Sequence, residues 1–487
     1  MSQPGITLLG LGPGDPALLT RQAWEILGNI PEIYLRTSMH PTVAGFPSEL
    51  RVHSFDQYYE EGASFEDVYE KIVDTVISLG KRETGIVYGV PGHPFIAEAT
   101  APEIARRAQD EDIQVTIVEG ISFIESTFGL LRIDPFPHTA LVDALELAIS
   151  HHPLFPPSAP AVIAQIHSPA VASNVKLTLM AVYPDNHRVK MVHGAGTKKA
   201  HVETLDLYEI DRSQNIGLLT SLYVPPLKSN SSFEGFQEVV AHLRAPDGCP
   251  WDREQTHLTL RPFLLEETYE VLTALDEEDQ EALQEELGDL LLQVVLHARI
   301  ASEYGDFSMV DVLQGIEDKL IRRHPHVFGD LDIDDQQKVL ENWEKLKSVE
   351  RDDVENDKNG VLDGVSPALP ALVQAETYQE RVNRVGFDWS NIQGVFEKIA
   401  EEISEVQEAG STEECEAEIG DLLFAVVNLA RWFKIDAESA LRAANTRFRN
   451  RFESLEAEIR NEGKDVSDLT LNELDELWVA IKQKERK

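Results

Sequence analysis

Two separate segments of the chain carry the same arrangement of glutamates on a stretch rich in Leu, Ile and Val. Residues 264–272 read LLEETYEVL, and residues 400–406 read AEEISEV. Positions i, i+3 and i+4 of a helix share one face, so the second and third glutamates of each segment project together and the first lies beside them. Such a face either is solvated or holds a cation, and the residues that follow each copy help to decide which.

A second acidic motif follows each copy. It reads ELGD at 286–289 and EIGD at 418–421, and it leads into a matching apolar run, LLLQVVLHAR or LLFAVVNLAR. A tryptophan beside an aspartate precedes each copy, in CPWD (249–252) and GFDW (386–389), and a basic segment follows each copy. The same order of motifs in both copies predicts an internal repeat.

The apolar run predicts a helix that is buried on nearly every side, so an acid on it points into a bundle. Burying several uncompensated carboxylates together is very costly, and a cation among them is therefore expected. Di-iron sites in helical bundles use Glu-x-x-His motifs. One such motif occurs, from Glu254 to His257, and the second copy has no counterpart to it. An all-oxygen donor set favours Mg²⁺ or Mn²⁺.

Basic residues spaced i and i+4 lie downstream of each acidic set, namely Lys319 with Arg323 and Arg447 with Arg451. Charged donors at this spacing are placed to contact the phosphates of a substrate held by a metal ion. Ordinary surface charge is the alternative interpretation of these four side chains.

These features resemble the MazG family of nucleoside triphosphate pyrophosphohydrolases over residues 230–487, in two tandem copies. The resemblance implies an all-α helical bundle that is completed in a homodimer. It also implies Mg²⁺-dependent cleavage of a nucleoside triphosphate to a monophosphate and pyrophosphate, for nucleotide-pool house-cleaning. The implied metal ligands are Glu267, Glu270, Glu286, Asp289, Glu402, Glu405, Glu418 and Asp421. Glu266 and Glu401 would orient or deprotonate water. The implied contacts to the substrate are Lys319, Arg323, Arg447, Arg451 and Trp478.

The first half carries a different set of motifs. The segment ITLLGLGPGD (6–15) ends a predicted strand in a glycine-rich turn, but its spacing differs from the dinucleotide-binding fingerprint. Together with YGVPGHPFIAEAT (88–100) and VEGISFIES (118–126), it resembles the tetrapyrrole methylase family, which binds S-adenosylmethionine in a cleft between two α/β subdomains. The implied cofactor-binding residues are Gly10, Gly12, Gly14, Gly92, Pro94 and Ser122. Where methylases often carry an acid before this proline, the chain has His93, so a scaffold or sensor remains an alternative to a methyltransferase.

The elements that position these residues differ between the halves. Short apolar runs, among them 6–12, 85–90 and 161–166, predict strands that alternate with helices. After residue 230, Glu- and Leu-rich segments with a period of 3.6 residues predict helices alone. We therefore expect a multidomain protein. Its predicted parts are an α/β methylase-like domain at 1–228, a first MazG-like repeat at 229–346, a charged linker at 347–366 and a second repeat at 367–487.

Bulk composition limits the partners. The chain has 487 residues and a formal net charge of −42, a field that repels nucleic acid polymers and anionic membranes. It has two cysteines without metal-binding spacing, no run long enough to span a membrane and no basic N-terminal signal, which together predict a cytoplasmic protein.

The two halves together resemble the YabN-type fusion of bacteria. The leading hypothesis is a nucleoside triphosphate pyrophosphohydrolase. The alternative is an S-adenosylmethionine-dependent methyltransferase or sensor that carries helical dimerisation modules. The sequence leaves open which repeat is active, the preferred base, the methyl acceptor, and whether the repeats pair within one chain or between two chains.

Overall fold

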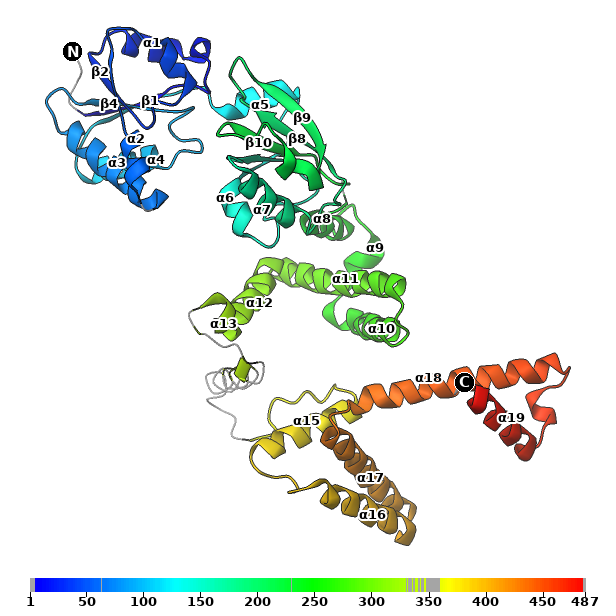
Figure 1. Cartoon of the computed structure of the whole chain (residues 1–487). Coiled ribbons are helices and arrows are strands. Elements are labelled where there is room, and N and C mark those ends of the chain that lie inside the picture. Colours follow the sequence, from blue (N-terminus) through cyan, green and yellow to red (C-terminus); the bar gives the residue numbers. More distant parts are fainter. Residues whose placement is uncertain are drawn as a thin grey trace. The chain divides into compact units, whose positions relative to one another are not determined.

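The computed structural model describes residues 5–62, 64–228, 230–329 and 360–484, with isolated residues between 331 and 346. Most of the predicted linker at 347–366 lies outside the described residues. The chain divides into two compact units, an N-terminal unit (Met1–Glu254) and a C-terminal unit (Gln255–Lys487) (Figure 1). Among the described residues, every helix is too short or too polar to span a bilayer.

The N-terminal unit begins with a five-stranded sheet in the order β3-β2-β4-β1-β5, in which all paired strands are parallel. Its strands are β1 (Ile6–Gly10), β2 (Glu32–Leu35), β3 (Arg51–Ser54), β4 (Ile86–Val90) and β5 (Val115–Val118). Its helices are α1 (Arg21–Leu27), α2 (Asp56–Glu61), α3 (Phe65–Gly80), α4 (Thr100–Asp110) and α5 (Phe123–Leu131), with 3₁₀ turns at η1 (Pro16–Leu18) and η2 (Pro41–Gly45).

At its central strands β1 and β4, both faces of this sheet are largely buried, as expected for a parallel sheet. Leu8 of β1 packs with Ile72 of α3 and Ile104 of α4 on one face. The next residue, Leu9, packs with Leu27 of α1 on the opposite face, because successive side chains of a strand point to opposite sides.

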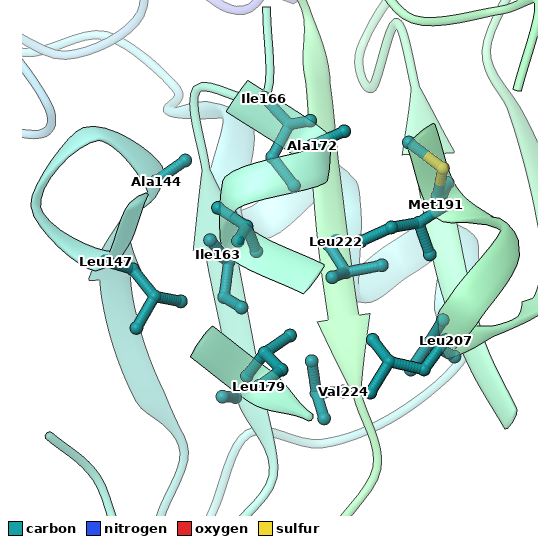
Figure 2. Packing of buried hydrophobic residues seen from close by; sticks show 14 of the residues in the cluster. Ala144, Leu147, Ile163, Ile166, Ala172, Leu179, Met191, Leu207, Leu222 and Val224 are labelled. Atoms are coloured by element: carbon teal, nitrogen blue, oxygen red, sulfur yellow. The ribbon is translucent and has the colours of Figure 1, made fainter. Parts of the chain in front are cut away.

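A second five-stranded sheet has the order β6-β7-β10-β8-β9. Only the β6–β7 pair is parallel among the described pairs. Its strands are β6 (Ala140–Asp143), β7 (Ala161–Ala164), β8 (Arg188–His193), β9 (His201–Asp206) and β10 (Thr220–Val224). The associated helices are α6 (Ala144–Ile149), α7 (Pro169–Leu179), η3 (Leu207–Arg212), α8 (Phe233–Leu243) and α9 (Pro250–Glu254). Figure 2 shows its core, in which Leu147 and Leu179 from the helices face Ile163, Leu222 and Val224 from the strands. The α/β prediction for this half is confirmed.

The C-terminal unit is helical throughout the described residues, as predicted. The first repeat contains α10 (His257–Asp276), α11 (Gln280–Tyr304), α12 (Met309–Arg323) and α13 (Pro325–Phe328). The second contains α15 (Ala371–Arg384), α16 (Ile392–Glu408), α17 (Thr412–Trp432), α18 (Ala437–Asn461), η4 (Val466–Asp468) and α19 (Leu471–Lys484). Three helical hairpins result: α10 packs on α11, α16 on α17, and α18 on α19.

Each acidic hairpin buries one face and leaves an apolar stripe exposed on the other. On α11 the stripe is Leu287, Leu291 and Val294, and α17 repeats it at Ile419, Leu423 and Val426. We predicted that the helices now seen as α11 and α17 are buried on nearly every side. In the single chain, each of them is buried on one side only. The spacing i, i+4, i+7 of each stripe matches the face that a helix presents to a packed partner.

Candidate functional site

The first acidic cluster joins the two helices of one hairpin. Glu267 and Glu270 project from α10 and Glu286 from α11, and one carboxylate oxygen of each lies within 4.8 Å of the others. Asp279 caps the start of α11 by accepting hydrogen bonds from the backbone of Glu281 and Ala282, which fixes the turn between the helices. The E-E-x-x-E and E-x-G-D motifs thus face each other across one hairpin.

The carboxylates of this cluster repel one another. Burial raises the pKa of Glu267 above its usual value, and the charges of Asp289, Glu270 and Glu286 raise it further. Burial likewise raises the pKa of Glu286, with added contributions from Glu270 and Asp289. Asp289, the predicted fourth ligand, is therefore close enough to act on Glu267. A divalent cation bound here would relieve the excess of negative charge.

The second cluster has the same construction. Glu402 and Glu405 of α16 and Glu418 of α17 have carboxylate oxygens within 4.8 Å of one another. Burial raises the pKa of Glu405, as do the charges of Glu402 and Glu418. Asp421 and Glu402 line one cavity beside the cluster.

Glu402 is the most constrained acid of this cluster, with a relative exposure of 2%. Its Oε1 lies 2.6 Å from Nζ of Lys398, which also lies 2.9 Å from Oε1 of Glu401. Its Oε2 is buried and has no hydrogen-bond partner. A buried carboxylate oxygen of this kind fits a metal ligand, because the all-oxygen donor set suits Mg²⁺. Sequence reasoning missed Lys398, although it lies one helical turn before the motif.

The predicted basic positions lie elsewhere in the described structure. Lys319 and Arg323 are on α12, and Arg447 and Arg451 are on α18. Trp478 of α19 lies beside Phe448 of α18, with 5.2 Å between ring centroids. The main charges acting on Glu267 and Glu405 come from α10, α11, α16 and α17. These five residues therefore belong to other helices than the ones that carry the carboxylates.

In the N-terminal unit, the glycine-rich turns after β1 and β4 are joined directly. The backbone N–H of Gly12 donates to the carbonyl of Gly92 at 3.2 Å, and that of Gly92 donates to Gly12 at 2.8 Å. Both residues have positive φ, +70° and +69°, a conformation that favours glycine. A Cβ on Gly10 would lie 2.5 Å from the backbone nitrogen of Gly120, so this turn also excludes side chains.

These turns border a cavity of 130 Å³. Of the six predicted cofactor residues, Gly92 and Ser122 line it. Ser122 also caps α5 by accepting a hydrogen bond from the backbone of Ile124. Gly14 has φ of +144° and packs closely against Thr197, and Pro94 is buried. The cavity is thus lined from both α/β subdomains, since Ala164 and Thr220 belong to the second sheet.

His40 was missed by sequence reasoning and lies in the wall of this cavity. It is 6% exposed, and its Nδ1 is buried without a hydrogen-bond partner. Burial lowers its pKa to about 4, so its imidazole is neutral at physiological pH. Two other wall residues, Ala97 and Gln165, have positive φ of 51° and 66° without being glycine. Such strained backbone often gathers where a protein binds ligands.

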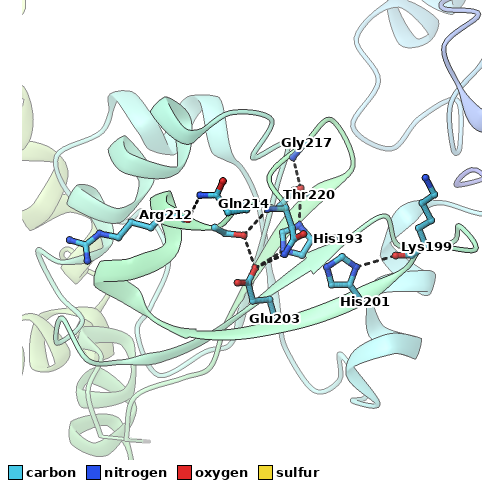
Figure 3. Close-up of polar contacts among 10 residues, drawn as sticks. His193, Lys199, His201, Glu203, Arg212, Gln214, Gly217 and Thr220 are labelled. Atoms are coloured by element: carbon cyan, nitrogen blue, oxygen red, sulfur yellow. Dashed lines mark hydrogen bonds and ion pairs between the residues drawn. The ribbon is translucent and has the colours of Figure 1, made fainter.

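Thr220, which lines this cavity, belongs to a network of polar contacts (Figure 3). Thr220 accepts a hydrogen bond from the backbone of Gly217 at 2.9 Å, and its Oγ1 lies 3.2 Å from Nδ1 of His193. Nε2 of His193 lies 3.2 Å from Glu203, which also accepts a hydrogen bond from Ser213 at 2.6 Å. Burial lowers the pKa of His193, so the neutral ring accepts from Thr220 and donates to Glu203. This chain of contacts fixes the 217–220 segment.

Comparison with known proteins finds a separate family match in each half of the chain. Residues 5–211 match the family of "Tetrapyrrole (Corrin/Porphyrin) Methylases", and residues 255–328 match the "MazG nucleotide pyrophosphohydrolase domain". The "Uncharacterized protein YabN" of Bacillus subtilis is 41% identical to this chain over 99% of both chains. The chain belongs to the YabN family. The predicted fusion of a methylase-like half with a MazG half is therefore confirmed.

Other known proteins are similar to about one half of the chain. The "Nucleoside triphosphate pyrophosphohydrolase/pyrophosphatase MazG" of Thermotoga maritima is 45% identical over 51% of this chain and 95% of its own length. Among solved structures, the uroporphyrin-III C-methyltransferase of Thermus thermophilus covers 46% of this chain and 93% of its own, at 18% identity and a TM-score of 0.35. At the level of the family, the helical half is a nucleotide pyrophosphohydrolase domain.

Proposed function

We propose that the C-terminal unit is a Mg²⁺-dependent nucleoside triphosphate pyrophosphohydrolase that releases a monophosphate and pyrophosphate, and that it serves nucleotide-pool house-cleaning. The observation that carries this proposal is the pair of acidic clusters, each of which draws carboxylates from both helices of a hairpin. The feature that points most directly to a bound cation is Oε2 of Glu402, which is buried and has no hydrogen-bond partner. A buried carboxylate oxygen requires such a partner. The similarity to MazG relatives supports the same reaction class.

We assign a different role in the proposed reaction to each group of side chains. The four acids of each set hold the metal, namely Glu267, Glu270, Glu286 and Asp289 in the first repeat and Glu402, Glu405, Glu418 and Asp421 in the second. Bound Mg²⁺ supplies neutralisation of phosphate charge and a lowered pKa for water. Glu401 and Glu266, exposed beside each cluster, accept the proton of the attacking water. Lys398 holds Glu401 and Glu402 in place through its two ion pairs.

The apolar stripes of α11 and α17 support a homodimer. Helical hairpins that expose matched stripes would bury them against a second copy, in keeping with the tendency of large apolar patches to mark interfaces. In such an assembly we expect the basic residues of α12 and α18 and Trp478 to approach a partner's carboxylates and to contact the substrate there.

Pyrophosphate release from a panel of nucleoside triphosphates with Mg²⁺ tests the proposal. Glu270→Gln and Glu405→Gln each remove one carboxylate of a cluster, and the double variant removes one from both. We expect the double variant to lose activity, while Glu408→Gln, an exposed substitution on the same helix as Glu405, keeps it. Full activity in the double variant would show that the acids are structural.

A second candidate function belongs to the N-terminal unit. We propose that its cavity binds S-adenosylmethionine, either for methyl transfer or as a sensor. The observation that favours this is the buried, unpartnered Nδ1 of His40 beside the linked turns of Gly12 and Gly92. Isothermal titration with S-adenosylmethionine tests binding, and absence of a heat signal for both the cofactor and its demethylated product would contradict it.

A further inference from the structure

Two buried hydroxyl groups line the cavity of the N-terminal unit. Ser122 lies at the start of α5 and Thr220 at the start of β10, with exposures of 1% and 2%. None of the described residues of the lining is Asp, Glu, Lys or Arg, and much of the lining is apolar, including Ile96, Phe123 and Leu218. The orientation of these two hydroxyls therefore bears directly on which ligand the cavity accepts.

The single hydroxyl proton of Ser122 is already engaged. Its Oγ donates a hydrogen bond to a carboxylate oxygen of Glu125, one turn along α5. The same Oγ accepts a hydrogen bond from the backbone N–H of Ile124 at 3.0 Å. Because a hydroxyl group has one proton and two lone pairs, Ser122 can offer a ligand only an acceptor.

The orientation of the Thr220 hydroxyl depends on His193, which is 4% exposed (Figure 3). A hydrogen bond from Ser213 lowers the pKa of Glu203 below its usual value, so this carboxylate is ionised and only accepts. Nε2 of His193 lies 3.2 Å from Glu203 and must therefore carry the proton of the neutral ring. Nδ1 of His193 is then bare, so it accepts the proton of Thr220, 3.2 Å away.

Thr220 is thus left as an acceptor, as Ser122 is. One lone pair of its Oγ1 accepts the backbone N–H of Gly217 at 2.9 Å, and the other can accept from a ligand. Two such acceptors fit a ligand that donates hydrogen bonds. A neutral amino group on a flat ring suits the apolar lining, whereas an ammonium ion would find no carboxylate among the described lining residues.

We propose that Glu203 and His193 are positioning residues that hold Thr220 as a hydrogen-bond acceptor for the amino group of a neutral ring, and that they make binding in this cavity depend on pH. The inference rests on the second candidate function, the binding of S-adenosylmethionine. A protonated His193 donates from Nδ1 to Thr220, which turns the hydroxyl proton toward the ligand. A donor then faces a donor, so acidification weakens binding.

The groups around His193 set where this change occurs. Burial lowers the pKa of His193 below 6.5, and Glu203 opposes this effect. His201, on β9 with its ring centroid 4.9 Å from that of His193, lowers this pKa further, whereas the backbone of Asn215 raises it. The neutral state of His193 is therefore the state at neutral pH, and its loss is expected below pH 6.5.

Titration calorimetry with S-adenosylhomocysteine, the demethylated cofactor, tests the inference. In the wild type we expect Kd to be constant above pH 6.5 and to rise by up to about tenfold on acidification, as for the loss of one buried hydrogen bond. In His193→Gln, Glu203 orients the amide so that Oε1 faces Thr220 and still accepts its proton, but this side chain does not titrate. This variant should keep the neutral-pH affinity of the wild type at acidic pH.

Thr220→Val removes the acceptor and should bind S-adenosylhomocysteine about tenfold more weakly at every pH. His151→Gln is the matched control, because His151 is an exposed histidine of the same unit. It should reproduce the wild-type pH profile.

A loss of affinity on acidification that persists in His193→Gln would overturn the inference, because another group, such as His40, would then cause it. Wild-type affinity in Thr220→Val would overturn it as well. Adenosine and inosine separate the inference from the proposed cofactor, because inosine carries a carbonyl in place of the amino group. If the wild type binds adenosine with the expected pH profile and inosine more weakly, but not S-adenosylhomocysteine, the cofactor is wrong and the amino-group site stands. If it binds S-adenosylhomocysteine but adenosine and inosine equally well, the amino-group site is wrong. If it binds none of them, both are wrong.

Discussion

Glu402 combines three features that single it out among the acids: near-complete burial, an ion pair with Lys398 and an oxygen without a partner. A ligand that binds only the folded state at 100 times its Kd stabilises a protein by about 2.7 kcal/mol, or about 5–10 °C in Tm for a unit of this size. We expect Mg²⁺ to raise the Tm of the wild type by this amount and to raise that of Glu402→Gln much less, as measured by calorimetry.

The control for this prediction is Glu408→Gln on the same helix, which should gain as much from Mg²⁺ as the wild type does. An equal gain in Glu402→Gln would mean that the cluster does not hold the ion. This comparison of the gain in Tm measures the binding of Mg²⁺ and does not depend on catalysis. It is therefore informative even if the protein is inactive for another reason.

His40 provides a residue-scale prediction of pH dependence. Burial lowers its pKa from 6.5 to about 4, so the unfolded chain binds a proton at this site more readily than the folded chain does. The stability that neutral His40 contributes is therefore present above pH 6.5 and is lost as the pH falls toward 4. That loss amounts to roughly 3 kcal/mol between pH 7 and pH 4.

The His40→Gln variant, which does not titrate in this range, should show a smaller loss. Urea unfolding followed through the amide I band of β-sheet measures it, since all strands of the described residues lie in the N-terminal unit. Identical pH profiles in the wild type and the variant would contradict a buried neutral His40.

The sequence predicts some of these residues and not others, for a physical reason. Glu267 and Glu270 lie three residues apart, as do Glu402 and Glu405, so helix geometry alone puts each pair on one face. His193 of β8 and Thr220 of β10 are separated in sequence, and no spacing rule links them. Lys398 is different: comparison of the two copies shows Lys where the first repeat has Phe263, and that difference was visible in the sequence.

At the scale of elements, strand prediction succeeded where apolar runs are buried on both faces. The runs at 6–12 and 85–90 became β1 and β4, which pair in the centre of the first sheet. Strand β9 gave no such signal, because it is an edge strand whose sequence, HVETLD, is mainly polar and only partly buried. Edge strands are commonly polar, which protects them from pairing with other chains.

The matched stripes on α11 and α17 lead to a prediction at this scale. Leu423 is 53% exposed and Leu291, at the equivalent position, is 41% exposed. If the stripes are buried in a homodimer, a carboxylate placed there would be desolvated without a partner. We expect Leu291→Glu and Leu423→Glu each to weaken the dimer, and the double variant to sediment as a monomer in analytical ultracentrifugation.

Leu154→Glu is the control, because Leu154 is 89% exposed and lies in the N-terminal unit. It should leave the sedimentation coefficient of the wild type unchanged. A monomeric wild type would instead favour pairing of the two repeats within one chain, and would count against the homodimer.

At the scale of the whole molecule, the two units were predictable because the pattern of apolar and polar residues along the sequence differs between them. Alternating apolar runs and turns give way near residue 230 to Glu- and Leu-rich helices, and the structure divides after Glu254. The acidic clusters all lie in the C-terminal unit, whereas the glycine turns and His40 lie in the N-terminal unit. The net charge of −42 makes bound divalent cations all the more necessary for an anionic substrate.

This separation predicts that the two sites can be disabled one at a time. Gly92→Val places a β-branched residue at a φ of +69°, in the turn that Gly92 shares with Gly12 and at the wall of the N-terminal cavity. Because β-branched residues strongly disfavour this conformation, the turn must shift. We expect affinity for S-adenosylmethionine to fall more than about tenfold, since a shifted turn loses at least one well-placed contact.

Pyrophosphate release from ATP by Gly92→Val should stay within about twofold of the wild type, because the N-terminal cavity and the acidic clusters are each built from residues of a different unit. Gly129→Ala is the control, since a Cβ there meets no atom within 4 Å. Titration calorimetry and the pyrophosphate assay, run on the same preparations, measure both effects. Loss of both activities in a variant that keeps its wild-type circular dichroism would mean that the N-terminal cavity controls the hydrolase, and the two units would then have to be treated as one coupled enzyme.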